Sequence, residues 1–307
     1  MFLNALNSML ALFGCMLIGF FCVRKKIFDD DANVVLNKLM LNIAVPAMFI
    51  SAMNVEMSPE LIREGSITLI AGFVYHLICV ALAFFTMKIF KIKSELKPIW
   101  LFGLTFANIA FLGFPVVKDI FGEQMLFHAT LFNISFNILV FSVGIIIISY
   151  GSNEIITTKK ILLQPAFIGS VLGITLFLLP VQLPIFIDKI LTMFGDVTPP
   201  LSMFVVGATL AATSILETFK NKFMYLFSFV KLVIIPAITY MVSNVLINDS
   251  EIVLLITVLS ATPSAVLTVI LAKRYNRDSE LASQIVFVST TLSVVTIPMI
   301  LIIDFLI

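Results

Sequence analysis

The chain has 307 residues, of which 60% are hydrophobic and only 12% are charged, and its formal net charge is +1. A soluble domain carries about 25% charged residues, and no soluble fold of this length hides so much apolar surface. The composition therefore excludes a soluble protein and indicates one whose solvent is a bilayer. The near-neutral charge gives no reason to expect a nucleic-acid partner.

Ten apolar segments follow one another along the chain. A spanning helix needs about 20 mostly apolar residues, and irregular backbone cannot face lipid. Helix is therefore the predicted state of each segment, since the runs are too long and continuous for a β-barrel. The predicted spans are residues 3–23, 34–53, 65–90, 99–120, 123–149, 161–180, 190–215, 222–247, 251–273 and 280–306.

Loop charges test this count. With the N-terminus outside, fourteen lysines and arginines fall in inside loops and three in outside loops, while Lys38 and Lys231 lie in helices, which accounts for all 19. Loops on the cytoplasmic side carry such an excess of basic residues. A missed helix would invert every later loop and remove the bias. The charges thus predict a multi-pass protein of the cell membrane with both termini outside.

The longest polar stretch, residues 151–160, divides the predicted helices into five and five. We expect a first five-helix repeat over 1–150, a short cytoplasmic connector over 151–160, and a second repeat over 161–307. An odd number of helices per half means that the second repeat is inverted. Asn42 before Pro46, and Asp196 before Pro200, both place a polar residue four positions before a proline. Inverted repeats with interrupted helices are a common transporter plan.

Catalytic motifs are missing from the sequence. It has no HExxH, GxSxG or Walker-type pattern and no cysteine pair with metal spacing. The two histidines, His76 and His128, lie in different segments with no carboxylate nearby in sequence. We therefore expect neither an enzyme nor a cofactor, and any transport would be secondary rather than driven by a nucleotide.

Two segments place polar side chains and helix breakers in mid-span. These candidate substrate-binding residues are Asn108, Gly113 and Pro115 in segment 4 and Thr262, Pro263 and Ser264 in segment 9. A broken helix frees backbone amides and carbonyls that can bind a substrate where they line a cavity. Spacing alone leaves a second interpretation open, namely a kinked helix whose Asn108 bonds to a neighbouring backbone.

Five short patterns occur in order along the chain. They are Asn37-Lys38 with Ala44-Val45-Pro46, Asn108 to Pro115 with Phe121-Gly122, Gly195-Asp196 with Met203-Phe204 and Gly207, Lys231 five residues before Pro236, and Pro263 followed by Ala272-Lys273 and Tyr275-Asn276. They resemble helices 2, 4, 7, 8 and 9 of the auxin efflux carrier family, which includes plant auxin exporters and bacterial organic-acid permeases. The resemblance covers most of the chain.

The resemblance implies an all-α membrane fold of ten helices in two inverted five-helix repeats, with interrupted helices 4 and 9 crossing near the midplane. It also implies a carboxylate site beside the crossing, where Asn108 would donate to the substrate and Pro263 would mark the break in helix 9. One departure is Ala107, since plant members carry proline there. We therefore expect a break in helix 4 that is milder, or one shifted toward Gly113 and Pro115.

Four further polar residues lie within spans. Lys231, about ten residues into segment 8, either serves the anion or the crossing region or snorkels to the interface. Asp196 can pair with a cation, accept a proton or cap a helix, and a cap or interfacial role is favoured. Asn133 and Asn137 lie one helical turn apart and so share a face. They either line the substrate cavity, with Asn42 and Pro46 as further candidates, or bond neighbouring helices.

The sequence thus predicts a secondary transporter that moves a small organic anion by alternating access. Malate, malonate or an auxin-like acid is implied by the resemblance alone. Protons or sodium as coupling ion, and a homodimer, stay open. The rival hypotheses are a sodium-coupled symporter of the bile-acid type and a membrane receptor or scaffold that transports nothing.

Overall fold

The computed structural model describes residues 2–28, 30–56, 58–150, 165–179, 183–211 and 215–306. This part of the chain is helical throughout, and its only β-type pairing is one isolated bridge. Six of its helical stretches are long and apolar enough to cross a membrane, and a bent pair makes a seventh. These findings confirm an all-α integral membrane protein. The predicted connector over 151–160 lies outside the described residues.

The first half contains most of the interrupted helices. Its elements are α1 (Phe2–Arg24), α2 (Asp30–Leu39), η1 (Met40–Ala44), α3 (Val45–Ala52), α4 (Pro59–Ile89), η2 (Ser94–Leu96), α5 (Lys97–Thr105), η3 (Ile109–Gly113), α6 (Phe114–Phe121), α7 (Met125–Leu139), η4 (Val140–Gly144) and α8 (Ile145–Ser149). The fifth predicted span, 123–149, is not straight, because the part up to Leu139 and the part from Ser142 meet at 41°. The π-helical turn η4 between them accounts for this bend.

The second half is also helical, with one π-helical turn in its described part. Its elements are α10 (Pro165–Leu178), α11 (Ile185–Leu210), α12 (Ile215–Lys220), α13 (Lys222–Phe229), η5 (Val230–Ile234), α14 (Ile235–Leu246), α15 (Ser250–Ser260), α16 (Leu267–Arg274) and α17 (Ser279–Leu306). Asp249 begins α15 by accepting from the backbone N–H groups of Glu251 and Ile252, as an N-cap residue does.

Three prolines follow π-helical turns rather than simple kinks. η1, η3 and η5 each end two residues before a proline, at Pro46, Pro115 and Pro236. In each case the residue just before the proline donates its N–H to the carbonyl five residues back. Proline cannot donate, and its ring clashes with the carbonyl four residues back. The wider turn removes that clash and lets the helix continue.

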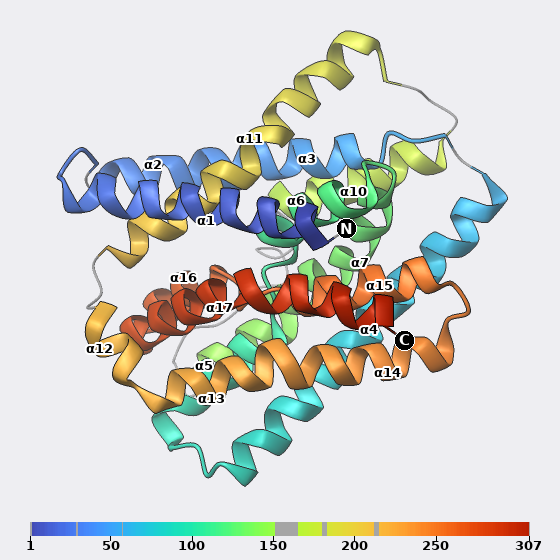
Figure 1. The fold of residues 1–307 in the computed structure, drawn as a ribbon. Coiled ribbons are helices and arrows are strands. Elements are labelled where there is room, and N and C mark those ends of the chain that lie inside the picture. Colours follow the sequence, from blue (N-terminus) through green and yellow to red (C-terminus); the bar gives the residue numbers. More distant parts are fainter. Residues whose placement is uncertain are drawn as a thin grey trace.

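The helices pack in two groups (Figure 1). In one group α1 lies along α11, and α3 packs between α10 and α11. In the other, α4 packs on α5 and α7, α6 packs on α7, α14 packs on α15, and α13 and α16 pack on α17. Helix α6 also contacts α1 of the first group. We call the first group the panel and the second the bundle. Each group contains helices from both halves of the chain.

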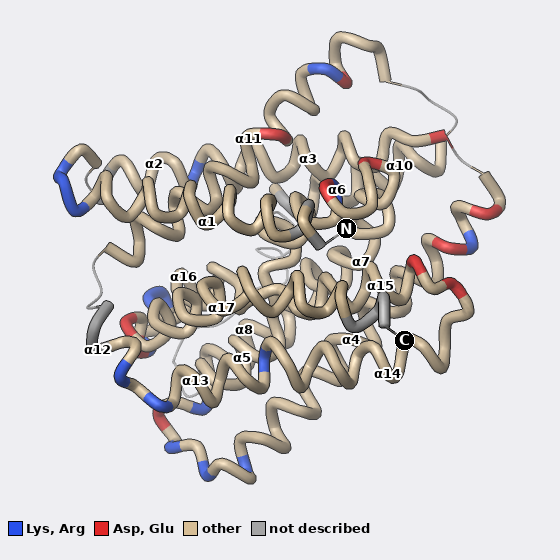
Figure 2. Tube along the Cα trace, in the orientation of Figure 1, with Lys and Arg blue, Asp and Glu red and all other residues tan. Residues whose placement is uncertain are grey.

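Charged residues are distributed unevenly along the helix direction (Figure 2). Lysines and arginines gather where α1 ends, between α4 and α5, and where α12 meets α13. Most acidic residues lie at the other end, near the start of α4 and between α14 and α15. We call these two regions the basic end and the opposite end. The N- and C-termini both lie toward the opposite end (Figure 1).

Candidate functional site

The fourth predicted span is broken in its middle. Helix α5 ends at Thr105, and Phe106 then takes extended backbone angles (φ −105°, ψ 108°). Asn108 is also non-helical (φ −81°, ψ 58°), and a continuous helix resumes with η3 and α6. The expectation of a milder break, or of one near Gly113 and Pro115, is therefore wrong. Proline is not needed before Asn108, because another part of the chain takes up the backbone groups that the break frees.

That other part is the break in the ninth span, between the end of α15 at Ser260 and the start of α16 at Leu267. The Asn108 N–H donates to the Pro263 carbonyl at 2.7 Å, and the Ala265 N–H donates to the Phe106 carbonyl at 2.9 Å. Ala107 and Ser264 thereby form an antiparallel bridge. Unpaired backbone groups are costly inside a membrane protein, so each break stabilises the other.

A cavity of about 170 Å³ lies beside this pairing. Its walls come from η1 and α3, from residues 107–111 at the first break, from α7, and from residues 265–274 at and after the second break. We call it the central cavity. It brings three of the predicted site residues together, namely Asn108, Asn133 and Asn137.

The three amides differ in their partners. The Asn108 Nδ2 group is buried and makes no hydrogen bond within the described part of the chain, and the same holds for the Asn133 Oδ1 atom. The Asn137 Nδ2 group instead donates to the Ser170 hydroxyl of α10 at 3.1 Å. Asn137 therefore both lines the cavity and joins two helices. A buried amide donor without a partner is costly, which suits a ligand that supplies an acceptor.

The start of the resumed helix faces the same cavity. The first N–H groups of a helix have no partner within it, and its N-terminus attracts negative charge. Asn108 is the N-cap of η3, but its side-chain oxygen accepts no cap bond, so it does not occupy the first N–H groups of the helix. Ile109 and Ala110, the next residues, also line the cavity. The arrangement is suited to hold a carboxylate without a full counter-charge.

Arg274 also lines the central cavity, and the sequence reasoning missed it as a site residue. It lies in the last turn of α16, its side chain is exposed, and it is the one cationic residue among the lining residues that the structure describes. In the sequence it counted only as an inside-loop charge. Arg274 and Asn108 are far apart in the sequence, and only the pairing of the two helix breaks brings them to one cavity.

Lys231 is fully buried but does not line the central cavity. Its ammonium donates to the Leu104 carbonyl at 3.1 Å and to the Tyr75 hydroxyl at 3.3 Å. Leu104 lies in the last turn of α5, where carbonyls lack helical partners and attract positive charge. No carboxylate of the described residues forms an ion pair with Lys231. Lys231 therefore contacts the end of α5, just before the break, and lies outside the central cavity.

The remaining candidate residues of segments 4 and 9 support the pairing of the two helix breaks. Thr262 packs against Gly113, where an added Cβ would lie 3.3 Å from the Thr262 methyl group and 2.9 Å from Leu259. The Ser264 hydroxyl contacts that of Thr268 at 3.1 Å. Pro263 contributes the carbonyl that accepts from Asn108. These residues hold the geometry but do not line the central cavity.

Three other candidates lie away from it. The exposed Asn42 amide donates to the Lys38 carbonyl one turn earlier at 2.7 Å, and Pro46 packs against Gly169 of α10. Asp196 is exposed and pairs with Lys118 at 3.4 Å. A capping role for Asp196 is wrong, because α11 begins at Ile185 and Asp196 lies well inside it. Its pairing with a cation, one of the other roles considered, is observed.

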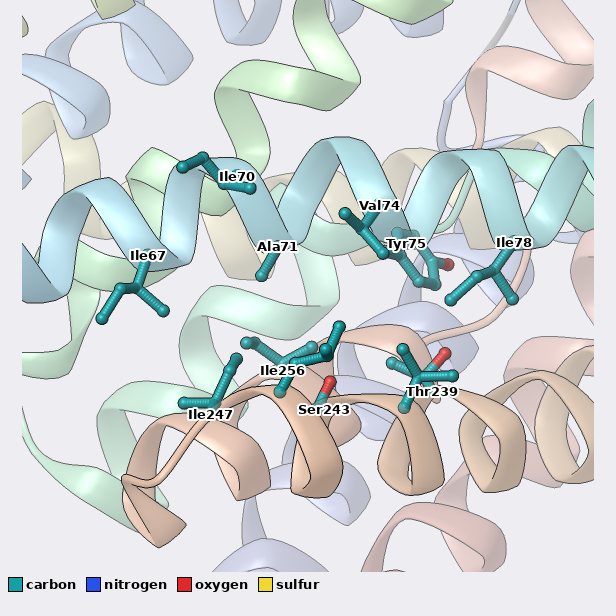
Figure 3. Close-up of a pocket in the computed structure, with 12 residues that line it drawn as sticks. Ile67, Ile70, Ala71, Val74, Tyr75, Ile78, Thr239, Ser243, Ile247 and Ile256 are labelled. Carbon is teal, nitrogen blue, oxygen red and sulfur yellow. The ribbon is translucent and has the colours of Figure 1, made fainter.

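A groove between α4 and α14 is of a different kind (Figure 3). It measures about 210 Å³ and is lined almost wholly by aliphatic side chains, with Tyr75, Thr239 and Ser243 adding hydroxyl groups. Ile70 at its edge is 62% exposed, so the groove opens sideways to the surface that faces lipid. It lacks the amides that make the central cavity the better candidate.

Comparisons with known proteins find similar transporters. The family model described as "Membrane transport protein" matches residues 4–157 and 152–301. An uncharacterized transporter of Methanocaldococcus jannaschii is 27% identical over 290 residues, or 92% of each chain. The uncharacterized transporter YfdV of Escherichia coli K12 is 25% identical over 308 residues, or 96% of each chain. Another, from Methanothermobacter thermautotrophicus, is 26% identical over 314 residues, covering 97% of this chain and 98% of the relative.

Proposed function

Because the chain belongs to the membrane transport protein family, that of the auxin efflux carriers, we propose that it is a secondary transporter of a small organic anion in the cell membrane. The observation that carries the proposal is the buried, unpartnered Asn108 amide in a cavity beside two paired helix breaks. A carboxylate supplies the acceptor that this amide lacks. The N-terminus of η3 and the charge of Arg274 favour an anion as well.

The size of the central cavity bears on the substrate. Pockets for drug-sized ligands measure roughly 300–1,000 Å³, whereas this cavity measures about 170 Å³. Among the acids that the resemblance implies, a short one such as malate or malonate therefore fits better than an auxin-like acid with a fused ring system.

The fold that we propose is ten membrane helices in two inverted five-helix repeats. Two observations support it. The broken spans occupy corresponding places in the two halves and pair antiparallel. The two stretches that match the family model meet at residues 152–157, within the predicted connector. In this arrangement the basic end faces the cytoplasm and both termini lie outside.

Alternating access would move the panel and the bundle against each other around the central cavity. Packing favours this division over one repeat rocking against the other, because α3 and α11 come from different halves and contact each other. Asn108 lies on the bundle side, and Val45 and Phe49 face it from α3. An anion held at Asn108 would thus be exposed to one side of the membrane at a time.

A sodium-coupled symporter remains the second candidate, since the amide oxygens of Asn108 and Asn133 could serve a cation. The described lining of the central cavity has no carboxylate but includes Arg274, which favours an anion. Transport that persists when potassium replaces sodium would exclude the symporter. A receptor or scaffold would show no transport of any acid.

The Asn108 side chain is the direct test of the site. We expect Asn108→Ala to weaken carboxylate binding roughly tenfold to hundredfold, because a hydrogen bond to a charged group contributes about 1.5–3 kcal/mol. The measurement is uptake of labelled malonate and malate into proteoliposomes, together with a ligand-induced rise in melting temperature.

Asn42→Ala is the matched control, because it removes the same amide from an exposed position outside the cavity. It should leave both readouts unchanged. Equal kinetics for Asn108→Ala and the unaltered protein, with a carboxylate that is transported, would refute the role of Asn108.

A further inference from the structure

A second cavity lies between the central cavity and the opposite end of the molecule. It measures about 280 Å³ and is lined by residues 48–55 at and after the end of α3, by α6, by the start of α7, and by residues 188–199 of α11. We call it the outer cavity. The central and outer cavities have no lining residue in common within the described part of the chain.

An aromatic contact separates the two cavities. Phe49 lines the central cavity and Phe114 lines the outer one. Their rings meet edge to face with centroids 5.9 Å apart, and both side chains are at most 2% exposed. Phe49 lies on α3 of the panel, whereas Phe114 begins α6, which continues from the broken span. The contact therefore joins the two groups of helices at the point where a substrate would have to pass.

An ion pair closes the outer cavity one turn further along the same helix. The Lys118 ammonium of α6 lies 3.4 Å from Asp196 of α11 and 2.8 Å from Glu123. The Lys118–Asp196 pair again joins the bundle to the panel. Its side chains are 36% and 62% exposed, and such exposed pairs are weak. A weak contact is suited to a closure that must open in every transport cycle.

Other polar contacts in the outer cavity stay within the panel. Asn54 donates to Asp188 at 2.9 Å, and the Ser51 and Thr192 hydroxyls are 2.9 Å apart. Both join the end of α3 to α11. These contacts need not part when the panel and the bundle move, so they differ from contacts that join the two groups.

We propose that Phe49–Phe114 and Lys118–Asp196 are the two layers of a gate, closed here, between the central cavity and the outside. The central cavity is then accessible from the basic end, where Arg274 lines it and is exposed to solvent. The proposal extends the transport function, but it concerns access to the cavity and not the identity of the substrate.

Thiol labelling tests the gate without any substrate. The three native cysteines, Cys15, Cys22 and Cys79, are replaced by alanine. Ala110→Cys then places a reporter in the central cavity. A membrane-impermeant methanethiosulfonate reagent is applied to membrane vesicles of either orientation. We expect labelling from the basic end and little from the opposite end.

Opening the gate should change this pattern. Asp196→Asn should raise the labelling rate from the opposite end roughly twofold to fivefold, because an exposed ion pair is worth little. Phe114→Ala should raise it roughly tenfold or more, because it removes a buried ring. Lys189→Gln, an exposed charge on the same α11, is the control and should change nothing. An unchanged rate in both gate variants, or an equal rise in the control, would overturn the proposal.

Cross-linking gives a second, independent readout. A short bifunctional maleimide that joins Lys118→Cys to Asp196→Cys should abolish transport. The same reagent joining Asn54→Cys to Asp188→Cys, both within the panel, should leave transport intact. Full transport after the first cross-link would refute the proposed gate even if the substrate class is right. A wrong substrate class would leave the labelling result untouched.

Discussion

At the scale of single residues, the molecule uses two buried polar side chains near the crossing in opposite ways. The Asn108 Nδ2 group has no hydrogen-bond partner among the described residues, whereas the Lys231 ammonium donates to the Leu104 carbonyl and the Tyr75 hydroxyl. The free group is the donor on which the proposed ligand site rests. The engaged group holds the end of α5 in place just before the break.

We expect Lys231→Met to reduce transport roughly tenfold or more without lowering the melting temperature. The change leaves the Leu104 carbonyl without its donor, which costs about 1–3 kcal/mol. It also removes the desolvation penalty of a buried ammonium, which is several kcal/mol, so stability does not fall. The end of α5, however, loses the ammonium that holds it in place beside the break. Uptake into proteoliposomes and thermal unfolding in detergent measure the two effects.

Lys222→Met provides the control, since Lys222 is exposed at the start of the same span. It should alter neither transport nor melting temperature. If Lys231→Met transports normally, the residue has no part in positioning the break.

At the scale of helices, the panel depends on backbones that approach closely. A Cβ on Gly207 of α11 would lie 1.7 Å from the Met16 carbonyl oxygen of α1, and one on Gly19 would lie 2.0 Å from the Phe204 carbonyl oxygen. The glycines are therefore reciprocal, one on each helix. Small residues allow such contacts between membrane helices.

Gly207→Ala should destabilise the protein by about 1–3 kcal/mol, because the new methyl group meets backbone that cannot move aside cheaply. Thermal unfolding of the purified protein measures this as a lower melting temperature. Gly14→Ala on α1 is the matched control, since a Cβ there meets nothing within 4 Å. Its better helix propensity should leave stability equal or raise it by up to about 1 kcal/mol. Equal melting temperatures for the two variants would contradict the close approach of α1 and α11.

At the scale of the whole molecule, charge is segregated along the helix direction, with basic residues at the end away from both termini (Figures 1 and 2). The sequence contained the same bias as an excess of basic residues in alternate loops. Such an asymmetry favours insertion with the basic end toward the cytoplasm.

The orientation is tested with reporter fusions in a bacterial host. Green fluorescent protein fused after Ile307 should stay dark, and alkaline phosphatase at the same point should be active, because both termini are proposed to lie outside. Fusions to a chain truncated after Lys26, at the basic end, should give the reverse pattern. A bright fusion after Ile307 would invert the proposed topology and the direction of the gate.

Composition and local pattern determined the membrane solvent, the helical state of the spans and the presence of interruptions in helices 4 and 9, but not the position of the break in helix 4. These features depend on apolar content, on proline and glycine, and on loop charge, all of which are read along the chain. What only the tertiary structure decided is how the interruptions are used. The break at Phe106–Asn108 needs no proline, because Pro263 and Ala265 bond to it from more than 150 positions away. For the same reason Asn42 lies outside the central cavity and Arg274 lies inside it. Contacts between distant segments satisfy buried polar groups, and no local rule of sequence specifies which segments meet.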